Sequence, residues 1–205
     1  FIYGTVSTID GEKYKGQIRW GDEETFWEDE FNSTKTDNPN NRWSKKEDLN
    51  LIKVNGESEW EFMGLWKDKN KYDFNWQNHQ FVCRYGDFKA IEPSGRSEVS
   101  LIFKDDSRLN VAGGSNDIGA RIKVMDPEMG LDALRWERVN RIDFESTPSK
   151  LKDKMGEPLY GKIKTLRGEF EGLIQWDHEE CLSTDKLDGN DNNGRVSIEM
   201  GDIKK

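Results

Sequence analysis

Two stretches of the chain, near its start and near its end, alternate apolar and polar positions in the same order. The alternating positions are Tyr14, Gly16, Ile18 and Trp20 in the first stretch and Phe170, Gly172, Ile174 and Trp176 in the second. A period of two is that of a half-buried β-strand. In both copies a preceding partner strand, with Val6 and Thr8 or with Ile163 and Thr165, is joined to the first by a glycine-containing turn. The sequence therefore predicts the same β-hairpin twice.

Glycine and tryptophan occupy matching places in the two predicted hairpins. Gly16 and Gly172 lie on the apolar face in mid-strand, where glycine adds no packing, so we expect a bend or a close backbone approach at each. Trp20 and Trp176 complete the alternation. We expect both to be core residues rather than ligand platforms, because each continues the inward-facing set.

The segments after the two hairpins differ in length. Both copies continue into a third predicted strand, at 25–31 and 181–187, but the second then passes directly to 196–203, whereas the first inserts residues at about 34–80 before 81–91. The middle of the chain, 94–150, has similar alternation. Two of the three segments end in an aromatic-x-x-apolar-x-x-Ile pattern, which begins at Tyr85 or at Trp136 and is spaced like one 3₁₀ turn leading into a final strand.

Four strands, a short turn and a fifth strand, with glycines in mid-strand, resemble the SH3-like and Sm-like small β-barrels. The resemblance implies an all-β chain of three tandem five-stranded barrels: 1–93 with an insertion at about 34–80, a middle barrel at 94–150, and 151–205 as an internal repeat of the first. Residues 1–33 plus 81–92 should then superpose on 158–205. Sm-like families often bind RNA, but their signature loops are missing from this chain, so that function is not carried over.

The composition indicates a folded protein with a small core. Hydrophobic residues make up 33% and charged residues 35% of the 205 residues, while 8 Trp and 5 Tyr add large apolar surfaces. We expect the units to pack on one another, because isolated barrels of this size bury little surface. The net charge of -9 argues against nucleic acid or anionic membrane as partners.

The sequence contains no apolar run long enough to insert into a membrane. The chain begins at Phe1, which fits either a mature exported protein or a trimmed chain. We favour an extracytoplasmic location, periplasmic or secreted.

Acidic residues gather at equivalent places in the two terminal copies. These candidate acidic clusters are Glu23, Glu24, Glu179 and Glu180. They could bind Ca²⁺ or a basic partner, but a solvated strand face is favoured, and we expect no metal and no cofactor. The run from Asp188 to Gly194 departs from the calcium-loop pattern and predicts a polar hairpin, and the run from Gly113 to Asp117 predicts a turn.

Histidines and cysteines form no catalytic or metal-binding motif. His79 and His178 lie in unrelated contexts. Cys83 aligns with Ile198, and Cys181 aligns with Thr25, so the two cysteines occupy different positions of the repeat. Two separate, half-buried thiols are favoured over a disulfide bridge, and we expect no catalytic residue.

Four tryptophans of the insertion are the candidate binding surface: Trp43, Trp60, Trp66 and Trp76. They either cover the flank of the first barrel, which we favour, or form a recognition surface for a protein or a glycan. The favoured hypothesis is a non-enzymatic binding or scaffold protein. The alternative is a carbohydrate-active hydrolase with two carboxyl groups about 5–9.5 Å apart across a groove.

Overall fold

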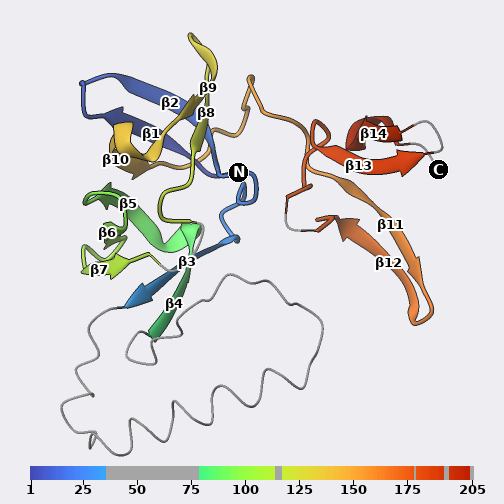
Figure 1. Ribbon diagram of the computed structural model, residues 1–205, viewed down its shortest axis with the longest axis horizontal. Helices are drawn as coiled ribbons and strands as arrows, with labels where there is room; N and C mark the ends of the chain where they lie inside the picture. The colour runs from blue at the N-terminus through green and yellow to red at the C-terminus, as the bar shows by residue number, and fades with distance from the viewer. Residues whose placement is uncertain (36–78, 114–116, 178, 192–193, 204–205) are drawn as a thin grey trace, which may run out of the picture.

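The computed structural model describes residues 1–35, 79–113, 117–177, 179–191 and 194–203, and in these ranges the chain is all-β (Figure 1). The predicted fold class is confirmed at this level. Nearly all of the predicted insertion lies outside the described residues, including Trp43, Trp60, Trp66 and Trp76. The choice between a covering flap and a recognition surface therefore stays a prediction.

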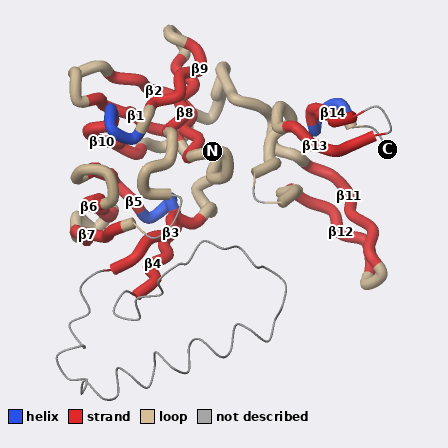
Figure 2. Tube along the Cα trace, in the orientation of Figure 1, coloured by secondary structure: helices blue, strands red, loops and turns tan. Residues whose placement is uncertain are grey.

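Ten strands from residues 3–144 form one antiparallel sheet (Figure 2). They are β1 (Tyr3–Thr8), β2 (Lys13–Trp20), β3 (Glu30–Lys35), β4 (His79–Arg84), β5 (Phe88–Pro93), β6 (Glu98–Phe103), β7 (Arg108–Ala112), β8 (Ile122–Asp126), β9 (Gly130–Leu134) and β10 (Val139–Phe144). Their order in the sheet is β4-β3-β7-β6-β5-β10-β1-β2-β8-β9.

This order interleaves the strands that the sequence assigned to separate units. Hairpin β1–β2 lies between β10 and β8, and hairpin β6–β7 lies between β5 and β3. The sheet thus consists of two five-stranded blocks, β10-β1-β2-β8-β9 and β5-β6-β7-β3-β4, and each block takes strands from both 1–93 and 94–150. The structure does not show the predicted three tandem barrels, because no sheet in the described ranges is closed.

Short 3₁₀ turns precede β5 and β10, the two strands through which the blocks pair. These turns are η3 (Tyr85–Asp87) before β5 and η4 (Trp136–Arg138) before β10, and a further one, η5 (Met200–Asp202), lies near the end of the chain. The backbone N–H of the residue after each turn donates to the carbonyl oxygen of its first residue. The two turns predicted from the aromatic-x-x-apolar spacing are therefore confirmed.

The glycine at position 16 marks a close approach of two strands. It pairs with Gly4 on β1, and a Cβ atom at Gly16 would lie 1.8 Å from the carbonyl oxygen of Met125 on β8. A Cβ atom at Gly4 would lie 2.1 Å from the carbonyl oxygen of Asp143 on β10. Hairpin β1–β2 can accept a neighbour strand on each side because both positions lack a side chain.

Aromatic side chains fill the core of the ten-stranded sheet. Trp20 is fully buried, as predicted, with ring centroids 5.3 Å from Tyr85, 5.8 Å from Phe31 and 5.8 Å from Trp136. Its indole N–H donates to the carbonyl oxygen of Asp117, 2.7 Å away, so the buried polar atom is satisfied. The large rings compensate for the low share of aliphatic residues.

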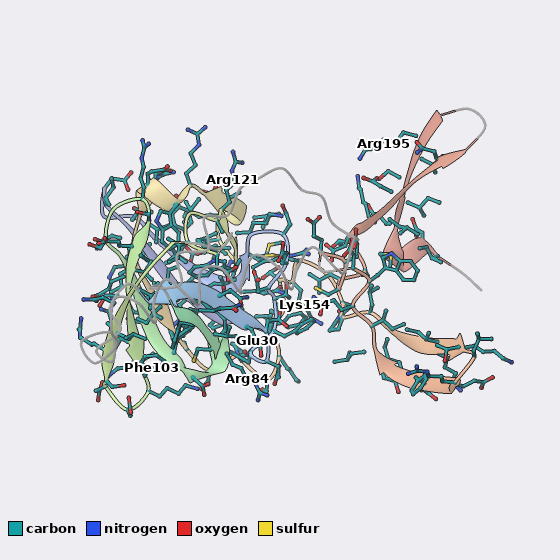
Figure 3. All side chains as sticks on the ribbon, turned by 60° about the horizontal axis from the view of Figure 1, so that its bottom comes forward. Glu30, Arg84, Phe103, Arg121, Lys154 and Arg195 are labelled. Atoms are coloured by element: carbon teal, nitrogen blue, oxygen red, sulfur yellow. The ribbon has the colours of Figure 1, made fainter. Side chains whose placement is uncertain are left out.

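The C-terminal segment forms two separate hairpins instead of a barrel. β11 (Tyr160–Thr165) pairs with β12 (Gly168–Leu173), and β13 (Lys186–Asp191) pairs with β14 (Gly194–Glu199). Figure 3 shows both hairpins standing away from the ten-stranded body, with Arg195 on the second. Near the body, Met155, Cys181 and Leu182 form a small apolar cluster with Phe1, Phe26 and Met125.

The two terminal segments make the same backbone hydrogen bonds at positions that the sequence aligns. In the first segment the bonds run from Ile2 N–H to Thr25 O, Ile18 N–H to Ile2 O, Trp20 N–H to Glu24 O and Tyr85 N–H to Asp29 O. In the same order, the C-terminal bonds run from Leu159 N–H to Cys181 O, Ile174 N–H to Leu159 O, Trp176 N–H to Glu180 O and Met200 N–H to Asp185 O. Local backbone structure is therefore alike in the two segments even though their sheets differ.

Candidate functional site

The apolar face of hairpin β11–β12 is exposed. Ile163, Phe170 and Trp176 are 45%, 60% and 54% exposed, whereas the aligned residues of hairpin β1–β2 are buried in the core. The core position predicted for Trp176 is therefore wrong. The physical reason is that Trp20 packs against Phe31 and Tyr85 of the other block, while in the described chain β12 pairs with β11 alone.

The second C-terminal hairpin adds apolar residues to the same part of the molecule. Ile198 on β14 and Ile203 after η5 are both exposed. We call the set Ile163, Phe170, Trp176, Ile198 and Ile203 the C-terminal apolar surface. Exposed apolar side chains on both hairpins of one segment make that segment the candidate interaction site, and a two-stranded hairpin is only marginally stable alone.

The other face of hairpin β11–β12 is suited to water. Lys162 pairs with Glu171 at 3.2 Å and Lys164 pairs with Glu169 at 3.3 Å, and all four side chains are largely exposed. Such exposed ion pairs contribute little to stability. The hairpin thus has one mostly charged face, which also exposes Tyr160 and Leu173, and one apolar face.

The predicted acidic clusters lie close together, at the junction between the body and the C-terminal segment. The guanidinium of the buried Arg19 donates to the carbonyl oxygens of Asp22 and Glu179, each 2.5 Å away, and pairs with the carboxylate of Asp185 at 2.5 Å. The turns that carry Glu23 and Glu179 therefore meet around one arginine. Instead of forming a cation site, this region holds the C-terminal segment to the body.

Two further contacts strengthen this junction. The side-chain oxygen of Gln17 accepts a hydrogen bond from the backbone N–H of Met155 at 2.8 Å. The carboxylate of Asp185 also accepts from the backbone N–H groups of Cys181 and Leu182. Asp185 therefore orders its own turn and binds the body through Arg19.

Glu24 differs from the other members of the acidic clusters because it is buried against a second carboxyl group. Its side chain hydrogen-bonds to Asp117, which is itself buried. Burial, together with repulsion from Asp117, raises the pKa of Glu24 far above its ordinary value, so Glu24 is protonated at neutral pH. Burial also raises the pKa of Asp117. No sequence pattern indicates this pair, because Glu24 and Asp117 lie far apart in the chain and the run from Gly113 to Asp117 predicts only a turn.

The geometry of the Glu24–Asp117 pair differs from that of a glycosidase. Two catalytic carboxyl groups face each other across a groove with room for substrate, whereas these two groups touch through a hydrogen bond inside the core. The backbone N–H of Asn32 also donates to Asp117. A shared proton between the turn that carries Glu24 and the loop that carries Asp117 is what this arrangement provides.

The remaining sequence-predicted candidates are mostly structural. Cys83 is half-buried and Cys181 is buried, and the two are separate thiols. Burial raises the pKa of both, that of Cys83 to about 11, so neither is a reactive thiolate. Asp188 and Gly194 belong to hairpin β13–β14, as predicted. His178 and the side chain of His79 lie outside the described residues.

A shallow hollow of about 660 Å³ lies beside η4 and is lined by Arg96, Ala133, Arg135, Glu137 and Arg138. Its Arg138 pairs with Glu12 at 2.7 Å and with Asp10 at 3.3 Å. The described residues contain no group of three or more His, Cys, Asp or Glu side chains that could hold a metal ion. In the same part of the chain, no helix has the length and apolar character needed to span a membrane.

Comparisons with known proteins give no relative: no family model, no curated protein and no solved structure matches the chain. The geometry of the described residues is therefore the basis for any functional conclusion.

Proposed function

We propose that this chain is a non-enzymatic binding or scaffold protein that engages a protein partner through its C-terminal apolar surface. The observation that carries the proposal is the contrast between matched positions. Phe170 and Trp176 continue the same alternation as Tyr14 and Trp20, yet they are exposed where Tyr14 and Trp20 are buried. Large apolar side chains that are exposed and do not pack in the core are typical of an interface.

In this proposal the two five-stranded blocks are SH3-like or Sm-like modules that act as a support. Block β10-β1-β2-β8-β9 has the order last strand, first, second, third, fourth, and block β5-β6-β7-β3-β4 has the same order circularly permuted; a 3₁₀ turn precedes β10 in the one and β5 in the other. The buried Arg19–Asp185 pair fixes the C-terminal segment to this support. The apolar surface is then presented from a defined position, which suits a scaffold.

The test compares matched substitutions in the two hairpins. Replacing Phe170 or Trp176 by Ser should leave the main thermal transition almost unchanged, because neither side chain contributes to the core. The same changes should lower the fluorescence of a hydrophobic dye bound to the protein. The matched controls Tyr14→Ser and Trp20→Ser should lower the melting temperature strongly, since they remove buried rings.

Two results would contradict the proposal. Early melting of Trp176→Ser, comparable to that of Trp20→Ser, would show that the C-terminal surface is part of the core in solution. Release of reducing sugar from a polysaccharide panel, abolished by Glu24→Gln, would replace the binding function with the hydrolase alternative.

A further inference from the structure

The partner of the C-terminal apolar surface can be inferred from how the body covers the same surface. The free edge of β2 in hairpin β1–β2 pairs with β8, a strand from a different part of the chain. In that pairing Ile18 lies opposite Val124, and Trp20 lies opposite Ile122. The hairpin of one segment is thus completed by the second hairpin of another segment.

The C-terminal segment contains both elements of this arrangement. Hairpin β11–β12 corresponds to β1–β2, with Gly161 opposite Gly172 as Gly4 is opposite Gly16. Hairpin β13–β14 corresponds to β8–β9, because Leu187 lies opposite Ile198 as Ile122 lies opposite Leu134. Both of these ladders lead into a 3₁₀ turn, η5 or η4.

Gly172 provides an independent sign that a strand belongs beside β12. At Gly16 a side chain is excluded, because the carbonyl oxygen of Met125 on β8 occupies the space of a Cβ atom. At Gly172 nothing lies within 4 Å of the equivalent position. A glycine in mid-strand weakens a strand unless a close neighbour requires it. The neighbour that would require Gly172 is not supplied by the described residues of this chain.

The strand β13 of the same chain does not reach β12. The turn between them is closed by reciprocal backbone hydrogen bonds between Trp176 and Glu180, and Asp185 is fixed to Arg19. The equivalent turn between Trp20 and Glu24 has the same two hydrogen bonds, and there too β2 and β3 belong to different blocks. The local geometry therefore directs the two hairpins of one segment toward different partners.

We propose that two copies of this chain associate by exchanging their C-terminal hairpins, so that β12 of each copy pairs with β13 of the other. This inference rests on the proposed function and names its partner. With the register of β2 and β8, Trp176 lies opposite Leu187 of the second copy, and Gly172 lies against the carbonyl oxygen of Asn190 of the second copy. The interface is self-complementary, so a two-fold axis closes both surfaces at once.

A second copy is the occupant that fits, because one chain offers both halves of the exchange. Among the described residues, β12 has an open edge beside Trp176 and Gly172, and β13 has an open edge beside Leu187. Pairing them sets Trp176 beside Leu187 of the second copy and removes exposed strand edges, which otherwise favour uncontrolled association. The exchange repeats between chains the interleaving that β1–β10 show within one chain.

The experiment measures the mass of the 205-residue chain by sedimentation equilibrium, from low micromolar to near-millimolar concentration. Twice the monomer mass of 23.9 kDa is expected. Gly172→Ala should give a monomer with an unchanged main thermal transition, because the added methyl has open space in one chain but collides with the second copy. The matched control Gly189→Ser should stay dimeric, since the equivalent positions carry side chains in Ser33 and Val124.

Two outcomes would overturn the exchange. One is a wild-type chain that stays monomeric at every concentration, and the other is a Gly172→Ala variant that stays dimeric. Dye binding separates these outcomes from failure of the proposed function. If the protein is a monomer and its dye fluorescence still depends on Trp176, the exchange is contradicted but the proposed binding surface is retained. A monomer that binds no dye loses both.

Discussion

Replacing Glu24 by Gln should stabilise the protein at alkaline pH. Glu24 is protonated in the folded state and hydrogen-bonded to Asp117, so unfolding above the ordinary carboxyl pKa releases a proton. A raised pKa of this kind stabilises the fold fully below the unfolded pKa, and the contribution is lost as pH rises toward the folded pKa. The Gln side chain keeps an N–H donor for Asp117 and has no proton to lose.

The size of the effect follows from this linkage. When only the folded chain holds one proton, the free energy of unfolding falls by about 1.4 kcal/mol for each pH unit gained. Between pH 5 and pH 8 the largest possible change is therefore about 4 kcal/mol. Relaxation around a carboxyl group reduces such values, and we expect Glu24→Gln to gain roughly 1–3 kcal/mol at pH 8 and much less at pH 5.

Urea unfolding followed by circular dichroism at pH 5, 6.5 and 8 measures this difference. Glu179→Gln is the control, because Glu179 is an exposed carboxylate in the equivalent turn and only its backbone oxygen binds Arg19. The shared proton would be refuted if Glu24→Gln raised the free energy of unfolding equally at every pH, or lowered it increasingly as pH rises.

Two further substitutions test the strand contact and the junction. Gly16→Val should lower the free energy of unfolding by more than the roughly 0.5–1 kcal/mol of strand propensity, because its Cβ atom would collide with Met125, and an unchanged melting temperature would contradict the close approach. Asp185→Ala should cost about 3–5 kcal/mol in the stability of the junction, since it leaves Arg19 buried and unpaired. Faster hydrogen exchange at Cys181 with little change in the ten-stranded body is the expected result, and unchanged exchange would count against this role.

Alternation along the chain was sufficient to predict local structure. The period of two placed hairpins at 3–20 and around 160–173, the spacing from Tyr85 and Trp136 placed two 3₁₀ turns, and Gly16 indicated a close strand contact. These features depend on residues near one another in the sequence, so the local order of apolar and polar residues is enough to predict them.

Strand partners could not be predicted in the same way. Alternation tells which face of β2 is apolar, but β8 and β3 present equivalent edges to it, and the pattern is the same whichever strand pairs there. Trp20 and Trp176 illustrate the limit, because similar surroundings in sequence lead to a buried and an exposed indole. Glu24 and Asp117 were missed for a related reason, since their contact joins segments far apart in the chain.

The interleaved sheet has a consequence for the order of events during synthesis. Hairpin β1–β2 emerges from the ribosome first, but its neighbours β8 and β10 follow only after residues 122–144. At about 5–20 residues per second, the two edges of hairpin β1–β2 wait on the order of 10 s for their partner strands. Pairing strands so distant in sequence is also slow. The nascent chain therefore needs protection over most of its length, and releasing it at residue 93 would yield neither sheet block.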